Sequence, residues 1–176
     1  MKLVVGKKAL CDNLSMTINS GECWGLLGKN GAGKTSLLKC IAGIIKPAEG
    51  SISLDAIPIQ NYGRKNLALR IGMLFQESLS SLPATVFETV LLGRYPHSKY
   101  VIKDSLSDIQ TTQNILEEVK LNELRDRELD TLSGGELQKV GIALLLAQDP
   151  GLLLLDEPSN HLDIAFAVQL LSLIHI

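Results

Sequence analysis

Residues 28–35 form a glycine-rich run in which a lysine and a threonine follow the last glycine. The run matches the pattern G-x-x-x-x-G-K-[ST] at every fixed position. Glycines let a loop turn its backbone N–H groups around phosphate oxygens, and a helix that starts there adds its positive end. Lys34 would neutralise β- and γ-phosphate charge, and the Thr35 hydroxyl would ligate Mg²⁺. The predicted phosphate-binding residues are Gly28, Lys29, Asn30, Gly31, Ala32, Gly33, Lys34, Thr35 and Ser36.

The alternative for this run is a glycine turn with an accidental lysine. An apolar run precedes the loop and a helical pattern follows it, and this context disfavours that coincidence. We therefore predict a phosphate site.

Two adjacent carboxylates, Asp156 and Glu157, follow the apolar run 152–155. A buried parallel strand carries its next residue to the carboxyl edge of the sheet, where α/β folds bind ligands. Asp156 would hold Mg²⁺ directly or through water, and Glu157 would polarise the attacking water, as in-line phosphoryl transfer requires. The alternative is a charged pair that merely ends a strand before Pro158.

A second pair of glycines lies in Ser133-Gly134-Gly135-Glu136. Ser133 is placed to cap a helix, and Glu136, three residues later, completes the spacing of a capping box. An ordinary capped helix start explains Ser133 and Glu136 but leaves the two glycines unexplained. Bare glycines there would expose backbone N–H groups to an anion.

The elements that position these residues alternate between strands and helices, which predicts an α/β fold with a parallel sheet. Apolar runs or alternation predict strands, and helical spacing predicts helices. Residues 77–127 contain fewer glycines and more charges, and we expect a mainly helical insertion there. The predicted strands are 14–18, 23–27, 51–55, 71–75 and 152–155, and the predicted helices are 37–41, stopped by Gly43, and 135–148.

Composition narrows the class of protein. With 176 residues, 45% of them hydrophobic, and a net charge of −2, the chain is globular in composition, and its charge gives no reason to expect nucleic acid as a partner. The apolar runs are too short to span a bilayer, and the N-terminus lacks the pattern of a signal peptide. Three widely spaced cysteines suggest neither a disulfide framework nor a zinc site. We expect a soluble cytosolic protein.

Taken together, the ordered motifs resemble those of ATP-binding-cassette (ABC) ATPases over nearly the whole chain. Ser133–Gly135 resembles the signature motif, Gln76 the Q-loop, and residues 159–163 the D-loop. The resemblance implies a single ABC cassette over residues 1–176, with the P-loop NTPase (RecA-like) fold, an antiparallel β-subdomain and a helical subdomain at about 77–131.

The resemblance also implies a mechanism that uses ATP and Mg²⁺. Two cassettes, most simply two copies of one chain, would close head to tail, so that Ser133, Gly134 and Gly135 contact the ATP of the partner subunit. The implied catalytic residues are Glu157, Lys34 and Gln76, and the implied metal ligands are Thr35, Gln76 and Asp156.

Residues 86–97 are similar to a segment of the importer ATPases for iron-siderophores, heme and cobalamin, and residues 160–164 fit the same group. The chain would then drive uptake through a separate membrane permease, which it contacts through residues 76–97, from the cytoplasmic face of the membrane. The alternatives are a non-transport cassette of the translation-associated type and a fragment that binds nucleotide without turnover. A chromosome-structuring ATPase is disfavoured because no long coiled coil separates the motifs.

Two features depart from the family pattern. Val4 and Val5 stand where many cassettes place an aromatic residue that stacks on adenine, and His175 follows Glu157 too closely to be the switch histidine. Residues 171–176, Leu-Ser-Leu-Ile-His-Ile, equal a translated sequencing adapter. We therefore expect a reading frame cut at Leu170, with the C-terminal part of the cassette missing. A natural helix that ends in apolar residues is the alternative.

Overall fold

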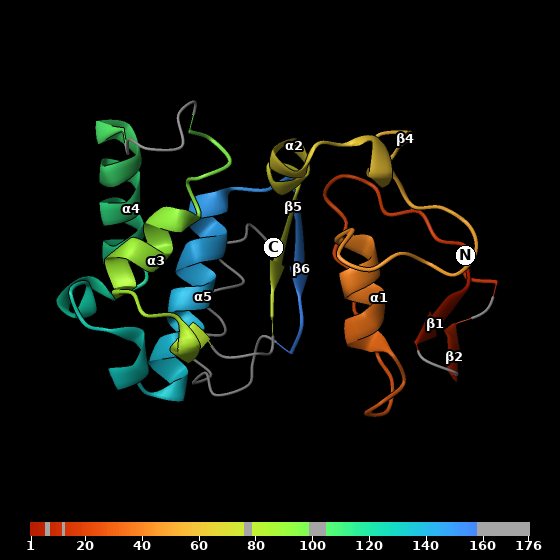
Figure 1. The fold of residues 1–176 in the computed structure, drawn as a ribbon, viewed down its shortest axis with the longest axis horizontal. Coiled ribbons are helices and arrows are strands. Elements are labelled where there is room, and N and C mark those ends of the chain that lie inside the picture. Colours follow the sequence, from red (N-terminus) through yellow and green to blue (C-terminus); the bar gives the residue numbers. More distant parts are fainter. Residues whose placement is uncertain (6–7, 12, 76–78, 99–104, 158–176) are drawn as a thin grey trace. The chain divides into compact units, whose positions relative to one another are not determined.

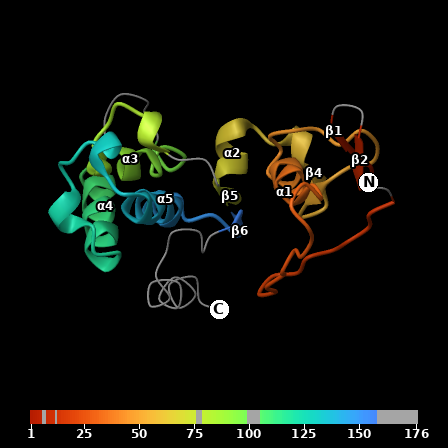
Figure 2. The same cartoon turned by 90° about the horizontal axis from the view of Figure 1, so that it is seen from below.

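The computed structural model describes residues 1–5, 8–11, 13–75, 79–98 and 105–157. These residues form two compact units that divide between Gly63 and Arg64. Figure 1 and Figure 2 show the ribbon in two views, coloured along the chain. The two units are described separately below.

The first unit combines one helix with two short antiparallel strand pairs. Its larger elements pack around the buried Leu37 and Cys40, against which Leu14, Ile45 and Ile52 are partly buried. The elements are β1 (Leu3–Val5), β2 (Lys8–Cys11), α1 (Lys34–Ile41), β3 (Ser53–Leu54), β4 (Ile57–Pro58) and a 3₁₀ turn at Ile59–Asn61. Strand β1 pairs with β2, and β3 pairs with β4 through a two-residue loop. The apolar face of α1 is therefore the centre of this unit.

Helix α1 confirms the predicted helix and its stop. Gly43 has a φ of 73°, and its N–H donates to the carbonyl of Cys40 at 3.0 Å. This left-handed residue just beyond the helix is the common way for a helix to end.

Two predicted strands of this unit are wrong. Residues 14–18 and 23–27 form no strand, and the side chains of Trp24 and Leu27 are 56% and 95% exposed. Alternation and apolar runs report which side chains favour burial, but a strand also needs a neighbour to satisfy its backbone hydrogen bonds. Neither run has a paired strand among the described residues.

The second unit contains a parallel strand pair covered by helices. Strand β5 (Ile71–Leu74) pairs with β6 (Leu152–Leu155) in the register Ile71↔Leu152 to Leu74↔Leu155. Its helices are α2 (Arg64–Ala68), α3 (Val86–Leu92), α4 (Leu106–Glu118) and α5 (Gly134–Gln148), with 3₁₀ turns at Leu79–Ser81, Asn122–Leu124 and Leu129–Thr131. The predicted strands 71–75 and 152–155 are confirmed, and the predicted helix 135–148 begins one residue earlier.

Helix α5 lies between the strand pair and helices α3 and α4 (Figure 1). Two glycines allow it to approach the strands closely. A Cβ atom on Gly141 would lie 2.8 Å from Leu74 Cδ1, and one on Gly72 would lie 2.4 Å from Leu145 Cδ1. Both faces of α5 are therefore packed, and its residues Val140, Ile142 and Ala143 are at most 1% exposed.

No helix within the described ranges is long and apolar enough to cross a membrane.

Candidate nucleotide site

The glycine-rich loop before α1 has the backbone geometry that only glycine adopts readily. Gly31 and Gly33 have φ values of 75° and 100°, in the left-handed region. The N–H of Ala32 donates to the carbonyl of Lys29 at 3.1 Å, which closes a turn inside the loop. Residues 28–32 are exposed, so the loop is open to a ligand.

The N-terminus of α1 carries backbone donors without side-chain acceptors. Gly33 occupies the N-cap position, makes no side-chain cap, and no acidic residue stands in the first turn. The first N–H groups of any helix have no partner within the helix, and its N-terminus carries partial positive charge. Thr35 and Ser36 lie in this turn and are partly exposed. The turn can therefore receive an anion.

Lys34 closes the loop on itself. Its Nζ donates to the carbonyl of Gly28 at 2.9 Å and to that of Lys29 at 3.3 Å. The ammonium group thus stands over the loop and is held by two exposed, neutral acceptors. A phosphate would offer it charged acceptors, which form stronger hydrogen bonds.

Asp156 lies at the carboxyl end of β6, as predicted. Its backbone N–H donates to the carbonyl of Leu74 at 3.2 Å, and its side chain is buried, with the residue 3% exposed. Oδ2 has no hydrogen-bond partner among the described residues. A buried carboxylate oxygen without a partner is costly, and a Mg²⁺ ion, which prefers oxygen ligands, would satisfy it. The donor set at this residue fits the predicted metal.

Glu157 follows at once, is partly exposed and has a φ of 51°. The left-handed backbone is uncommon for a residue other than glycine and costs free energy. Glu157 and Asp156 belong to the second unit, whereas Lys34 and Thr35 belong to the first. The structure therefore describes the two halves of the predicted site one by one.

The predicted capping box at the start of α5 is confirmed. The N–H of Glu136 donates to Ser133 Oγ at 3.3 Å, and the N–H of Ser133 donates to Glu136 Oε2 at 2.7 Å. Hydrogen bonds from the Ser133 side chain and backbone lower the pKa of the Glu136 carboxyl. Gly134 is exposed and Gly135 partly exposed, so the first turn of α5 is accessible from outside.

Several predicted residues lie outside the described ranges: Gln76, the loop 159–163, and the C-terminal residues 171–176 with His175. Their predicted roles stay predictions. Val4 and Val5 lie on β1.

Sequence reasoning missed two side chains of the segment 86–97. Tyr95 is 53% exposed, as a loop residue would be, but Arg94 and His97 contact the last carbonyls of α5 at 2.8 Å. Contacts between residues about 50 positions apart leave no local pattern. The signal that could have pointed to them was two basic residues close to a helix end.

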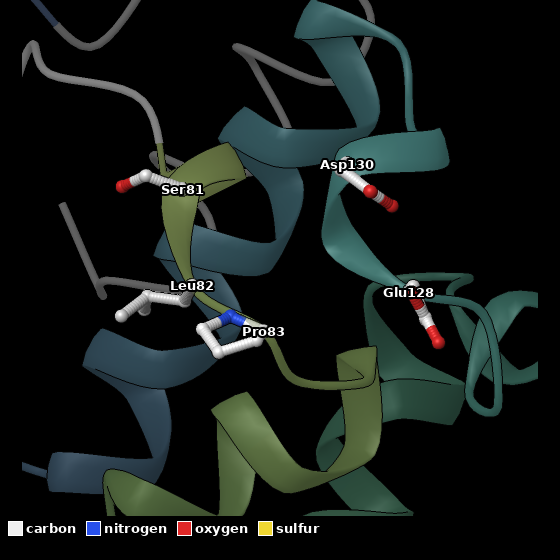
Figure 3. A pocket seen from close by; sticks show the side chains of 5 residues that line it. All are labelled: Ser81, Leu82, Pro83, Glu128 and Asp130. Atoms are coloured by element: carbon white, nitrogen blue, oxygen red, sulfur yellow. The ribbon is translucent and has the colours of Figure 1, made fainter.

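A shallow hollow opens near the same segment (Figure 3). It lies between the 3₁₀ turns at Leu79–Ser81 and Leu129–Thr131, and Ser81, Leu82, Pro83, Glu128 and Asp130 line it. None of these is a predicted ATP contact, but residues 81–83 belong to the segment that we expect to face a permease.

Comparison with known proteins identifies relatives across this region. The profile of the family described as ABC transporter matches residues 11–160. The ferric enterobactin transport ATP-binding protein of Escherichia coli K12 is 37% identical over 174 residues, which cover 99% of this chain and 64% of that protein. The phosphonates import ATP-binding protein of Alcaligenes faecalis is 38% identical over 176 residues, which cover 96% of this chain and 63% of that protein. The chain thus spans less than two thirds of the length of both relatives.

Solved structures support the same grouping. A dimeric ATP-binding cassette in a post-hydrolysis state, bound to ADP and Pi, superposes with a TM-score of 0.81 at 27% identity. The match covers 98% of this chain and 77% of that chain. The cassette fold predicted from the ordered motifs is confirmed by this likeness.

Proposed function

Because the chain belongs to the ABC transporter family, we propose that it is the ATP-binding and ATP-hydrolysing subunit of an importer and acts with a separate membrane permease. One observation supports nucleotide binding most strongly. The loop 28–33 and the uncapped N-terminus of α1 present backbone donors and Lys34 at an exposed surface. Such a surface attracts phosphate groups.

In the proposed reaction, backbone N–H groups of residues 28–36 hold the phosphates. Lys34 exchanges the carbonyls of Gly28 and Lys29 for phosphate oxygens. Thr35, Gln76 and Asp156 would hold Mg²⁺, which neutralises phosphate charge when bound. Glu157 orients the attacking water and accepts its proton.

We propose that a second copy of the subunit completes the site. Ser133, Gly134 and Gly135 would contact the ATP of the partner subunit with the exposed first turn of α5. The dimeric arrangement of the solved cassette with ADP and Pi supports this proposal. ATP would then favour the closed dimer, and hydrolysis would release it.

The proposed substrate is an iron chelate, heme or a cobalamin-type compound. The Escherichia coli relative is named for ferric enterobactin transport, which supports an iron chelate. The Alcaligenes faecalis relative is named for phosphonates import at nearly the same identity, so a phosphonate is a second candidate. Residues 76–97 are the proposed contact with the permease, at the cytoplasmic face of the membrane.

The test of nucleotide binding separates binding from turnover. We expect Lys34→Ala to weaken binding of a fluorescent ATP analogue at least about tenfold, the effect of losing one charge-assisted contact worth about 1.4 kcal/mol. The matched control is Lys39→Ala, which removes the same charge from the last turn of the same helix. Equal affinities of the two variants would contradict the proposed site.

Phosphate release by the same samples measures turnover. Hydrolysis that is lost in Glu157→Gln, with analogue binding retained, supports the catalytic role of Glu157. Binding without any turnover in the unsubstituted chain would favour the alternative of a nucleotide-binding fragment. Uptake of labelled ferric chelate against labelled phosphonate, in cells that carry the neighbouring permease genes, would decide between the two substrate classes.

A further inference from the structure

Helix α5 ends with all four of its terminal carbonyls satisfied. The last four carbonyl groups of a helix have no partner within the helix. In α5 the carbonyls of Leu145 and Leu146 accept hydrogen bonds from the backbone N–H of Asp149, at 3.2 and 3.1 Å. Asp149 has a φ of 48° and is the left-handed cap of the helix. This backbone motif accounts for two of the four carbonyls.

The other two carbonyls are bound by side chains from the turn that follows α3. Arg94 Nη1 donates to the carbonyl of Ala147 at 2.8 Å, and His97 Nε2 lies 2.8 Å from the carbonyl oxygen of Gln148. A carbonyl only accepts, so the imidazole nitrogen must donate. Basic groups at a helix C-terminus also interact favourably with its partial negative charge. We call Arg94 and His97 the α5 clamp.

The clamp is fixed on its own side as well. Arg94 Nε donates to Asp108 Oδ1 at 3.0 Å, and the side chains of this ion pair are only 17% and 10% exposed. Ser105 Oγ, at the start of α4, donates to Asp108 Oδ2 at 2.7 Å. The guanidinium therefore joins α4 to α5 with its planar set of donors, which a lysine cannot reproduce.

Steric fit places the turn directly against the helix. A Cβ atom on Gly93 would lie 2.4 Å from the carbonyl oxygen of Leu144 and 2.8 Å from Ala147 Cβ. Any larger residue would push the turn away from α5. Glycine at this position is thus a condition for the two clamp contacts.

The last residue of α5 also contacts the strand region. Gln148 Nε2 donates to the carbonyls of Ala68 and Ile71, at 2.6 and 3.0 Å. Strand β5 starts at Ile71 and pairs in parallel with β6, which ends at Asp156. One helix end thus joins the segment after α3, the N-terminus of α4 and the strand pair.

We propose that Arg94 and His97 are positioning residues that hold α5 where its first turn, Ser133–Gly135, can contact the ATP of a second chain. This inference rests on the proposed function, because it concerns the dimer formed around ATP. Helix α5 is a continuous helix, so fixing its C-terminus also fixes the placement of its N-terminal turn. The clamp would in this way join the proposed permease-facing segment to the ATP-contacting turn.

The test measures ATP-dependent dimerisation of the Glu157→Gln chain by analytical ultracentrifugation. We expect Arg94→Gln and His97→Leu, each added to that variant, to raise the dimer dissociation constant about tenfold, with the ATP affinity of the single chain unchanged. His97→Gln keeps a side-chain donor and should stay within about twofold of the parent. The matched control is Arg125→Gln, which removes a guanidinium that binds Gln113 and stacks on Phe87.

Unchanged dimerisation in both clamp variants would overturn the inference, and so would an equal loss in Arg125→Gln with an equal fall in its urea midpoint. A Glu157→Gln chain that binds ATP and never dimerises would contradict the proposed function instead. In that case hydrogen exchange decides the inference. Faster exchange at amides 134–137 in the clamp variants supports it, and faster exchange confined to 145–149 overturns it.

Discussion

Two buried aspartates of the second unit have opposite surroundings. Asp108 is 7% exposed and accepts hydrogen bonds at both carboxylate oxygens, from Arg94 and Ser105. Asp156 is 3% exposed, and its Oδ2 has no partner among the described residues. A fully bonded buried carboxylate stabilises the fold once it is folded, whereas one with an unsatisfied oxygen costs free energy until a ligand arrives. The contrast separates a structural carboxylate from a binding one.

The same substitution should therefore act differently at the two residues. Asp108→Asn is expected to lower the free energy of unfolding by about 1–3 kcal/mol, because the charged hydrogen bonds to a buried guanidinium are lost. Asp156→Asn should leave it unchanged or raise it when Mg²⁺ is absent. Urea unfolding in EDTA at neutral pH measures both. A loss at Asp156 as large as that at Asp108 would contradict the assignment.

The destabilisation by Asp108→Asn should depend on pH. The Ser105 hydroxyl, helped by Arg94 and opposed by burial, holds the pKa of the Asp108 carboxyl below its ordinary value of 3.8. A group whose pKa is lowered on folding stabilises the fold above its unfolded pKa, and this stabilisation is lost as the pH falls through the folded value. The difference between the unsubstituted chain and the variant should be constant down to about pH 5 and shrink below about pH 4. A difference that grows in acid would contradict this.

At the scale of the elements, two helices of the second unit start with the same device. Ser133 and Glu136 form a capping box at α5, and Thr85 and Glu88 form one at α3. The geometry is equivalent, with the N-cap N–H donating to the glutamate at 2.7 and 2.8 Å. Only the box at α5 is followed by two glycines at an exposed turn.

This pair allows stability and binding to be separated. Ser133→Ala and Thr85→Ala should each cost about 1 kcal/mol of unfolding free energy, the usual effect of losing an N-cap hydroxyl. Only Ser133→Ala should also weaken ATP-dependent dimerisation of the Glu157→Gln chain, because only that hydroxyl is proposed to contact ATP. Chemical unfolding and ultracentrifugation measure the two effects. Equal losses of dimerisation would show that Ser133 acts through helix stability alone.

Across the whole molecule, the sequence predicted elements whose patterns are local. Apolar runs predicted β5 and β6, and the spacing of Ser133 and Glu136 predicted the start of α5, since these signals lie within a few residues. The run Cys23–Leu27 failed because an apolar pattern does not say which strand will pair with it. The contacts of Arg94 and His97 with α5 join distant positions and depend on how helices pack, so single-sequence reasoning could not find them.

The two units have cores of very different size, which leads to a last prediction. Among the described residues, the second unit has fourteen buried residues in its main cluster, and the first has two. Since hydrophobic burial supplies most of the stability, amides of α1 should exchange faster than those of α5 without nucleotide. ATP at about 100 times its Kd should then slow exchange in α1 by about two orders of magnitude, which corresponds to about 2.7 kcal/mol. Exchange mass spectrometry measures this, and Lys34→Ala should abolish the slowing while Lys39→Ala preserves it. Equal protection of α1 by ATP in both variants would show that the nucleotide does not bind through this loop.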